Sequence, residues 1–408
     1  MAASSSAAPV SIVLVGIGGY GNTAVDALLK NPLRQDWQLV GVVDPVAEKA
    51  PAYAELKSLG LPFYDTLDEF YQVGKTDLAF ISSPIQFHAP QTCTALAHGT
   101  NVLCEKPACA TIQEARQMAA ARDAAGRFAA IGYQWSYAQA VLDLKADIQA
   151  GRLGQPRRLK TMWLWPRNDA YYARNNWAGA RQSPQGDWIL DSPASNACAH
   201  YLHNMLFVLG RSGQAAAAQP RSVQAELYRA NPITSYDTAA IRIMTDDDVE
   251  ILFYTTHAVS RNSGLELIYE FDEATATYNT SKHLVVHFKN GTVKDYGTPA
   301  GQTYLKYRDA IATVQGEKTM ACTIDSATPH IICINAAENS VNNEIAEFPA
   351  GLVYKMGVPG SQVRVMTGLT ERFTKAYQSN ILPAELGACS WARLGKIVDT
   401  TSYDVFCG

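Results

Sequence analysis

The chain has 408 residues, which is long enough for two or three domains. Hydrophobic residues make up 47% of it and charged residues 18%, a composition too apolar for a disordered chain. The formal net charge is −4 and lysine and arginine form no dense cluster, so nucleic acid is not expected as a partner. No apolar run is long enough to cross a bilayer, and no membrane partner is predicted.

Residues 1–9 are small and polar, and they lack the basic and apolar regions of a secretory signal. We therefore predict a flexible lead-in and a cytoplasmic protein, with the remnant of a removed export peptide as the alternative. Eight cysteines are spread along the chain without a CxxC pair. This spacing indicates reduced thiols rather than a disulfide framework.

A glycine-rich turn follows the first predicted strand, at residues 11–15, and a helical stretch at residues 22–30 comes next. In such a turn, one glycine permits the sharp bend, a second lets a pyrophosphate approach the backbone, and a third lets the helix pack closely on the sheet. The motif predicts dinucleotide binding by Gly16, Gly18, Gly19, Tyr20 and Gly21.

The second predicted strand, at residues 38–43, ends at Asp44. A carboxylate at this point can accept hydrogen bonds from the adenosine ribose hydroxyls of NAD. It would repel the 2′-phosphate of NADP, and Pro45 stands where an arginine could pair with that phosphate. NAD is therefore favoured over NADP as the cofactor. Asp44 could also cap a helix that follows the strand, and the two roles are compatible.

Strands and helices then alternate as far as residue 131. The pattern predicts helices at 47–59, 67–73, 90–98 and 112–125, and strands at 77–81, 101–104 and 128–131. Such a series builds a parallel sheet, and ligands bind in the loops at the carboxyl ends of its strands. The candidate cofactor residues in these loops are Ser83, Pro84, His88, Glu105, Lys106 and Gln134. His88 could instead cap the helix that we expect to begin at Pro90.

The pattern changes after a predicted helix at 139–150. Seven consecutive strand-like runs follow between residues 158 and 288, and most of them are amphipathic. These runs predict a predominantly antiparallel open sheet. Helices are expected at 304–314 and 329–345.

The predicted fold class is α/β plus α+β, with an N-terminal Rossmann parallel sheet and a C-terminal antiparallel open sheet. We expect a lead-in at 1–9, an NAD-binding Rossmann domain at 10–133, a substrate and oligomerisation domain at 134–345, and an extension at 346–408 that packs on the body.

The segment 163–177 is rich in aromatic side chains that alternate with arginine, asparagine and aspartate. Aromatic faces and hydrogen-bonding groups together line sites for polyhydroxylated rings, so a sugar or cyclitol is the implied ligand. A structural aromatic cluster is the alternative. The candidate substrate residues in this segment are Trp163, Arg167 and Tyr172.

Three motifs carry a resemblance to a known family: Glu105-Lys106-Pro107, Ala130-Ile-Gly-Tyr-Gln134, and Asn196-Ala-Cys-Ala-His200-Tyr-Leu-His203. Over residues 10–345 the chain resembles the glucose–fructose oxidoreductase/inositol dehydrogenase family, Gfo/Idh/MocA. The resemblance implies that Lys106 is the lysine of the family's Glu-Lys-Pro motif and that His200 is its catalytic histidine. It also implies that Glu105 contacts the cofactor ribose and that Arg167 and Tyr172 lie near the substrate.

The chain departs from the family motif D-x-G-x-H-x-x-D at both aspartates, where it carries Asn196 and His203. An asparagine can orient a hydroxyl but cannot take its proton, so acid–base chemistry shifts toward His200 and Lys106. Asp191 is a possible substitute carboxylate near Asn196.

Oxidation of a secondary alcohol by NAD⁺ requires a base for the hydroxyl proton. His200 is the candidate general acid/base because an unperturbed histidine has a pKa of about 6.5, and Lys106 is expected to orient the hydroxyl. His200 and His203 could instead be core histidines. They could also form a metal cluster with Cys198, but no remote third ligand is evident and no metal is predicted.

The sequence thus predicts an NAD-dependent oxidoreductase that transfers a hydride between the nicotinamide and a secondary hydroxyl of a sugar, sugar derivative or cyclitol. One alternative is a glycoside hydrolase or lyase that uses tightly bound NAD for a transient oxidation followed by elimination. Another is an NAD-binding sensor without turnover. The expected partners are a small carbohydrate substrate and further copies of the chain, in a homodimer or homotetramer formed through the C-terminal sheet.

Overall fold

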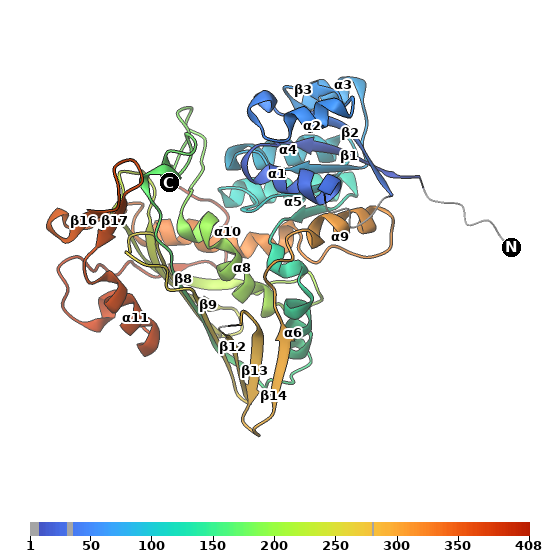
Figure 1. Cartoon of the computed structure of the whole chain (residues 1–408). Coiled ribbons are helices and arrows are strands. Elements are labelled where there is room, and N and C mark those ends of the chain that lie inside the picture. The colour runs from blue at the N-terminus through green and yellow to red at the C-terminus, as the bar shows by residue number, and fades with distance from the viewer. Residues whose placement is uncertain (1–7, 31–35, 280) are drawn as a thin grey trace. The chain divides into compact units, whose positions relative to one another are not determined.

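The computed structural model describes residues 8–30, 36–279 and 281–408 (Figure 1). Most of the predicted lead-in at 1–9 lies outside these residues. The chain forms two compact units. The first comprises Met1–Cys109, Glu114–Tyr137 and Gln302–Asp325, and the second comprises Ala110–Gln113, Ala138–Gly301 and Ser326–Gly408.

The first unit is built on a six-stranded parallel sheet in the order β3-β2-β1-β4-β5-β6, the strand order of a Rossmann fold. Its central strands are buried, which explains why they read as unbroken apolar runs. The strands are β1 (Val10–Val15), β2 (Trp37–Val43), β3 (Phe63–Tyr64), β4 (Leu78–Ile81), β5 (Asn101–Cys104) and β6 (Ala129–Ile131). The predicted Rossmann sheet is confirmed.

The helices between these strands differ from the expected ones at two prolines. The predicted helix at 47–59 is divided because Pro51 has no N–H and holds Ala50 in an extended conformation. The helix expected at 90–98 begins earlier, with Pro84 as its N-cap and Pro90 inside it. The helical segments are η1 (Gly19–Gly21), α1 (Asn22–Val25), η2 (Asp26–Lys30), η3 (Ala47–Lys49), α2 (Tyr53–Ser58), α3 (Leu67–Val73), α4 (Ile85–Ala97), α5 (Ile112–Ala125) and η4 (Gln134–Tyr137).

Residues 302–325 return to the first unit, although the sequence pattern assigns them to the second domain. They contain α9 (Leu305–Val314), which packs on β4 and β5. The segment after α9 meets the edge of β6, where the Ile131 amide donates to the carbonyl of Cys322 over 3.1 Å. Sequence patterns do not detect a return of this kind because the contacting residues lie far apart along the chain.

The second unit contains a ten-stranded sheet, with the order β14-β13-β12-β11-β7-β10-β9-β8-β15 and β18 also paired to β8. Two strand pairs are parallel, β7 with β10 and β8 with β15. The others are antiparallel, so the predominantly antiparallel sheet is confirmed. The strands are β7 (Pro156–Leu164), β8 (Pro220–Arg229), β9 (Thr238–Thr245), β10 (Glu250–Thr256), β11 (Leu265–Phe271), β12 (Ala274–Tyr278), β13 (Leu284–Phe288), β14 (Val293–Gly297), β15 (Ala346–Glu347) and β18 (Val398–Asp399).

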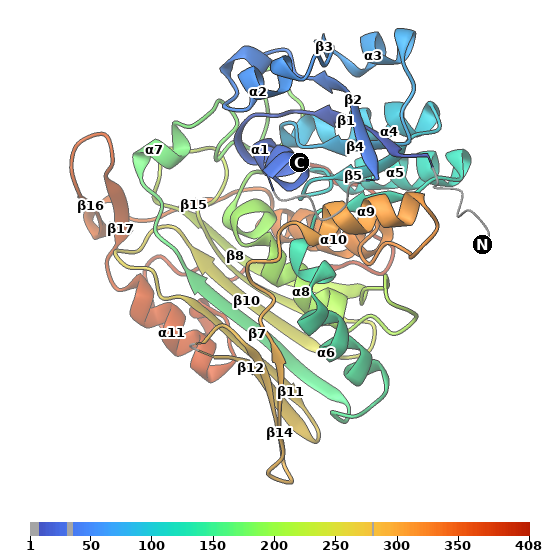
Figure 2. The same cartoon turned by 45° about the vertical axis from the view of Figure 1, so that its right-hand side comes forward.

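Helices cover both faces of this sheet (Figures 1 and 2). On the inner face, which packs against α8, Thr161 of β7 donates to the sulfur of Met205 over 3.4 Å. The remaining elements are α6 (Gln139–Gln149), α7 (Asp169–Tyr172), η5 (Pro193–Ala197), α8 (Ala199–Val208), α10 (Ile324–Ser340), η6 (Ala350–Leu352), β16 (Val353–Met356), β17 (Val363–Met366), α11 (Leu369–Ser379) and η7 (Pro383–Leu386).

The C-terminal extension, residues 346–408, covers the outer face of β7–β10. Phe373 and Tyr377 of α11 and the later Trp391 pack in one buried cluster with Met162 and Tyr254 of the sheet. The Tyr254 hydroxyl also donates to the carbonyl of Ile381 over 2.8 Å. The chain thus buries this apolar sheet face with its own residues.

A buried carboxylate lies beneath the extension. Glu226 of β8 is fully buried and accepts from the Ala384 amide over 2.8 Å and from the Tyr228 hydroxyl. Burial raises the pKa of Glu226 from 4.5 to about 7. The folded protein therefore holds a proton that the unfolded chain releases in this window, so Glu226 lowers the free energy of unfolding as the pH rises from about 4.5 to 7.

We expect Glu226→Gln to remove this pH dependence. Relative to wild type, the variant should gain about 3 kcal/mol of unfolding free energy between pH 5 and pH 8. Urea unfolding at both pH values measures the change, and the exposed Glu344→Gln is the matched control. An equal pH dependence in wild type and Glu226→Gln would contradict this assignment.

No helix in the described part of the chain is both long and apolar enough to span a membrane. In the described part of the chain none of the eight cysteines forms a disulfide, in agreement with their scattered spacing.

Candidate active site

The glycine turn joins β1 to the first helical turn of the first unit. Gly16 adopts a positive φ of 78°, and an added Cβ would lie 2.9 Å from the backbone of Ser82. At Gly21 an added Cβ would lie 2.2 Å from the carbonyl oxygen of Gly16. A Cβ at Gly18 or Gly19 would meet no atom within 4 Å. Gly16 and Gly21 are thus required by packing, whereas Gly18 and Gly19 present backbone on an open side, as the approach of a pyrophosphate requires.

These two environments predict different defects for two similar variants. Gly21→Ala should lower the free energy of unfolding by about 1–3 kcal/mol, because the methyl group displaces the backbone of the turn. Gly18→Ala should change stability by less than about 0.5 kcal/mol and weaken NADH binding about tenfold, because its methyl group faces the pyrophosphate side. Thermal unfolding and an NADH fluorescence titration measure both quantities. Equal destabilisation by the two variants would contradict the packing difference.

Asp44 holds the glycine turn from the end of β2. One carboxylate oxygen, Oδ2, accepts from the Ile17 amide over 3.0 Å, and the other accepts from the Val46 amide over 2.9 Å. The carboxylate therefore caps the turn that follows β2 and is fixed against the glycine turn. Asp44 is not the N-cap of the following helix, because the N-cap of η3 is Val46 and no side chain caps it. A hydrogen bond from ribose to Asp44 stays a prediction.

His88 connects two loops of the first unit. Its ring nitrogens contact the carbonyl oxygens of Pro107 and Ser83, each at 2.8 Å. The side chain is buried, and this burial lowers the pKa of His88. His88 lies within α4 rather than at a helix end, so it does not cap a helix that begins at Pro90. Its contacts align the loops that carry Ser83, Pro84 and Lys106, and its own contact with the cofactor stays a prediction.

Glu105 forms a buried ion pair that sequence analysis did not predict. Its Oε1 contacts the ammonium group of Lys306, and the Tyr307 hydroxyl donates to the same oxygen over 3.4 Å. Lys306 is fully buried in α9. Next to Glu105, the partly buried Lys106 begins a cis peptide bond with Pro107.

The Glu105–Lys306 pair lies beside the glycine turn. The Lys306 ammonium group is 4.9 Å from the centroid of the Tyr20 ring. The Tyr20 hydroxyl in turn donates to Oε1 of Gln134 over 3.1 Å. The structure thus brings together three of the predicted cofactor residues, Tyr20, Glu105 and Gln134, around a lysine from the return segment.

In the second unit, Asp191 and Asn196 form one hydrogen-bonded pair. Nδ2 of Asn196 donates to Oδ1 of Asp191 over 2.7 Å, and the Gly179 amide donates to Oδ2 over 2.7 Å. Asp191 is buried. Asn196 belongs to η5, which Ser192 caps, and the half-buried His200 lies in the first turn of α8. A carboxylate therefore accepts a hydrogen bond from Asn196, and Asp191 is the nearby carboxylate that the sequence suggested.

The aromatic residues of the segment 163–177 are connected by ring and cation–π contacts. Trp163 stacks on Trp165 with ring centroids 4.3 Å apart, and its indole N–H donates to Asn262 over 2.7 Å. The Arg167 guanidinium lies 3.5 Å from the centroid of the Trp165 ring and 4.5 Å from that of Tyr171. Cation–π stacking on two rings fixes this guanidinium.

Two further residues contact these aromatic side chains, and the sequence analysis did not select them. The Tyr172 hydroxyl lies 3.0 Å from Nδ1 of the buried His257. Arg174 lies over the Tyr171 ring, 3.8 Å from its centroid, and donates to the Tyr171 carbonyl over 2.6 Å. Arg174 stands in the segment 163–177 and could have been selected there. His257 follows β10 without any local signal.

His203 is a core residue. It is buried, and its ring stacks on Phe207 with centroids 5.7 Å apart. Burial, together with the nearby charges of His330 and Lys145, lowers the pKa of His203 well below its usual value. Within the described residues, no three histidine, cysteine or acidic side chains form a group that could hold a metal ion.

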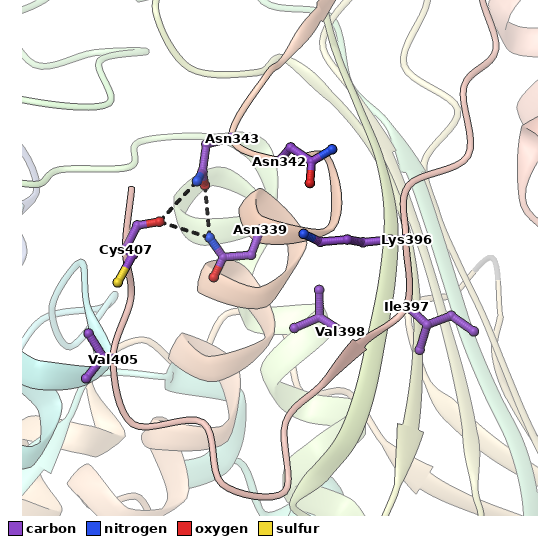
Figure 3. Close-up of a pocket in the computed structure, with 8 residues that line it drawn as sticks. All are labelled: Asn339, Asn342, Asn343, Lys396, Ile397, Val398, Val405 and Cys407. Atoms are coloured by element: carbon purple, nitrogen blue, oxygen red, sulfur yellow. Dashed lines mark hydrogen bonds between the residues drawn. The ribbon is translucent and has the colours of Figure 1, made fainter.

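A separate pocket of about 520 Å³ lies in the second unit, between the end of α10 and the C-terminal segment (Figure 3). The carbonyl of Cys407 accepts from the side chains of Asn339 and Asn343 there. None of the predicted site residues lines this pocket. The lining residues are Asn339, Asn342, Asn343, Lys396, Ile397, Val398, Val405 and Cys407.

Comparisons with known proteins support the predicted Rossmann fold of the first unit. Residues 10–133 match the model of the GFO_IDH_MocA oxidoreductase family with an NAD-binding Rossmann fold. The chain is 32% identical over 144 residues to the rhizopine catabolism protein MocA of Rhizobium meliloti, a match that covers 35% of this chain and 43% of that protein. It is 28% identical over 163 residues to the 1,5-anhydro-D-fructose reductase of Ensifer adhaerens, covering 39% and 47%. The matches span less than half the length of either relative.

The whole fold is similar to solved structures. The WlbA dehydrogenase of Bordetella pertussis, in complex with NADH and UDP-GlcNAcA, superimposes with a TM-score of 0.67 at 18% identity. That similarity covers 82% of this chain and 98% of the other. This similarity shows the fold of the chain, and the family match identifies residues 10–133 as an NAD-binding Rossmann fold.

Proposed function

We infer that this chain, a member of the Gfo/Idh/MocA oxidoreductase family, transfers a hydride between NAD and a secondary hydroxyl of a sugar, sugar derivative or cyclitol. The observation that carries this proposal is the glycine turn, with its open side at Gly18, in one chain with Lys106 and with His200, which begins α8 four residues after the Asp191-bound Asn196. The relative named 1,5-anhydro-D-fructose reductase supports a sugar-type substrate.

The first unit binds and orients the cofactor. Backbone at Gly18 and Gly19 receives the pyrophosphate, Asp44 accepts from the adenosine ribose, and Glu105 contacts the second ribose. NAD, when bound, accepts or returns the hydride. Ser83, Pro84 and His88 shape the loop beside it, and Tyr20 and Gln134 close the turn through their hydrogen bond.

The substrate's proton is handled by the chain itself. His200 takes the hydroxyl proton during oxidation and returns it during reduction, and Lys106 orients and polarises the hydroxyl. Asn196, held by Asp191, orients a neighbouring hydroxyl without taking a proton. Trp163 and Tyr172 contribute to the wall on which the ring lies.

Lys106→Met should lower kcat/KM by about 100-fold, because the hydroxyl loses the cation that orients it while the proton acceptor His200 is retained. Steady-state NADH formation on a turned-over substrate measures this, with the exposed Lys57→Met as the matched control. Wild-type turnover in both Lys106→Met and a His200 variant would reject the mechanism.

A panel of free sugars, inositols and aryl glycosides, incubated with the protein and NAD⁺, tests the proposal. NADH formation and aglycone release are followed together. NADH without aglycone supports the dehydrogenase, whereas aglycone with constant NADH supports the glycosidase alternative. If neither NADH nor aglycone forms and NADH binds tightly, the result supports a sensor.

Association of copies through the sheet stays a prediction. The extension covers the outer face of β7–β10, so a homodimer or homotetramer would use β11 and β12. The outer face of these strands carries Glu266, Ile268, Glu270, Thr275 and Thr277, which share a face with Lys160 through their cross-strand pairs. This surface is mostly polar. Light scattering of the purified chain tests the prediction.

A further inference from the structure

Two guanidinium groups of the second unit share one aromatic ring. The guanidinium carbons of Arg167 and Arg174 lie 4.5 Å and 3.8 Å from the centroid of the Tyr171 ring. The two cations are also close enough for the charge of Arg174 to lower the pKa of Arg167. Like charges held this near one another repel, which is unfavourable unless an anion joins them.

The cluster has too little negative charge of its own. Among the described residues Arg167 forms no ion pair, and Arg174 approaches only Asp191, at 3.7 Å between Nη2 and Oδ2. Asp191 already accepts from Asn196 and from the Gly179 amide. The other buried carboxylate near Tyr172, Asp237, accepts from Asn231 and Thr238. Arg167 is thus left without an ion pair within the described ranges, and an anion beside it would balance its charge.

Two buried nitrogens of the cluster lack protein partners. Within the described part of the chain, Nε of Arg167 and Nε2 of His257 have no hydrogen-bond partner, although His257 is only 2% exposed. Buried polar atoms of this kind normally have a partner, so each one calls for a ligand atom.

Tyr172 and His257 are both uncharged at neutral pH. Burial raises the pKa of Tyr172 well above its ordinary value, so the hydroxyl keeps its proton. Burial and the charges of Arg167 and Arg174 lower the pKa of His257 well below its ordinary value, so the ring is neutral. The tautomer with its proton on Nε2, in which Tyr172 donates to Nδ1, offers a hydrogen bond to a ligand acceptor. Nε of Arg167 can only donate, so a ligand with acceptor atoms satisfies both nitrogens.

We propose that Arg167, Arg174 and His257 bind the carboxylate of the substrate, which is a sugar acid or another polyhydroxylated acid. A carboxylate accepts hydrogen bonds only, matches the planar fork of a guanidinium and carries the single negative charge that the cluster lacks. The carboxylate site rests on the side chains of the second unit alone. Its assignment to a substrate rests on the proposed oxidoreductase function.

Calorimetric titration of the full chain with D-glucuronate, D-gluconate and L-tartrate, with and without NADH, tests the site. D-glucose is the neutral counterpart, and glucose 6-phosphate tests a phosphate in place of the carboxylate. We expect at least one acid to bind more tightly than D-glucose and the phosphate. In Arg167→Gln and Arg174→Gln, its affinity should fall about 10- to 100-fold, as for a lost charge-assisted hydrogen bond.

Two further variants keep the result interpretable. Arg174→Lys preserves the charge and should retain part of the affinity, because the fork geometry alone is lost. Arg221→Gln removes an arginine of β8 that pairs with Asp248, and this variant should bind the acid as wild type does. Equal affinity for acid and neutral sugar, tighter binding of the phosphate, or unchanged acid affinity in both glutamine variants would overturn the proposal.

The carboxylate site and the oxidoreductase function fail in different ways. Acid binding that depends on the two arginines, without NADH formation from any acid, would retain the site and reject the dehydrogenase. NADH formation from neutral sugars, unaffected by either arginine, would retain the dehydrogenase and overturn the carboxylate site.

Discussion

Replacing His200 by asparagine should lower kcat for NADH formation by about 10²–10⁴-fold on a substrate of the native enzyme. Asparagine can hold a hydroxyl by a hydrogen bond, but it cannot take the proton that must leave as the hydride departs. The neighbouring Asn196 cannot take that proton either, and Asp191 is engaged by Asn196 and Gly179. The variant therefore retains substrate contacts while it loses its proton acceptor.

The pH profile separates this role from a structural one. In the wild type, kcat/KM for oxidation should rise with pH as the base loses its proton, and this limb should disappear in His200→Asn. The exposed His287→Asn is the matched control and should keep both the rate and the limb. An unchanged limb in His200→Asn would assign the proton to another group, with Lys106 as the next candidate.

Local patterns were sufficient to predict the Rossmann sheet and to place the candidate cofactor residues on it. The glycine turn, Asp44 and Glu105 each stand at the end of a strand whose apolar run is visible in the sequence, and parallel strands bring such ends to one edge. Lys306 could not be predicted in this way. It reaches Glu105 because residues 302–325 return to the first unit, and a single lysine in a helical segment gives no sign of burial.

The substrate half shows the same division. Asp191 and Asn196 are five positions apart in the chain, and their pairing was predictable from that proximity. His257 comes from the end of β10 and meets Tyr172 only because the parallel β7–β10 pairing aligns the two strand ends. Its contribution depends on sheet order, which the amphipathic runs did not specify.

The extension illustrates a further limit. The sequence analysis expected the extension to pack on the body but did not say where. Its amphipathic helix α11 places Phe373 and Tyr377 on one face of the C-terminal sheet, the sheet through which copies of the chain were expected to associate. An exposed apolar face and a face covered by a later segment have the same strand pattern. Only the tertiary structure distinguishes them.

Lys306→Met should destabilise the fold by about 3–5 kcal/mol, because it leaves the carboxylate of Glu105 buried without its cation. Glu105→Gln should also be costly, since the fully buried Lys306 then loses its anion. The double variant leaves no uncompensated charge, so it should be less destabilised than the sum of the two single variants. Urea unfolding of all four proteins measures this coupling.

Lys318→Met is the control, because this partly exposed lysine pairs with the buried Asp309, which keeps its ion pair with Arg308, so its loss should cost less than about 1 kcal/mol. NADH titration of the double variant then separates folding from cofactor binding. If Glu105 contacts the cofactor ribose, the double variant should bind NADH more weakly even though much of its stability is restored. Restored stability with wild-type NADH affinity would limit Glu105 to the ion pair, and additive losses in the cycle would contradict the pairing itself.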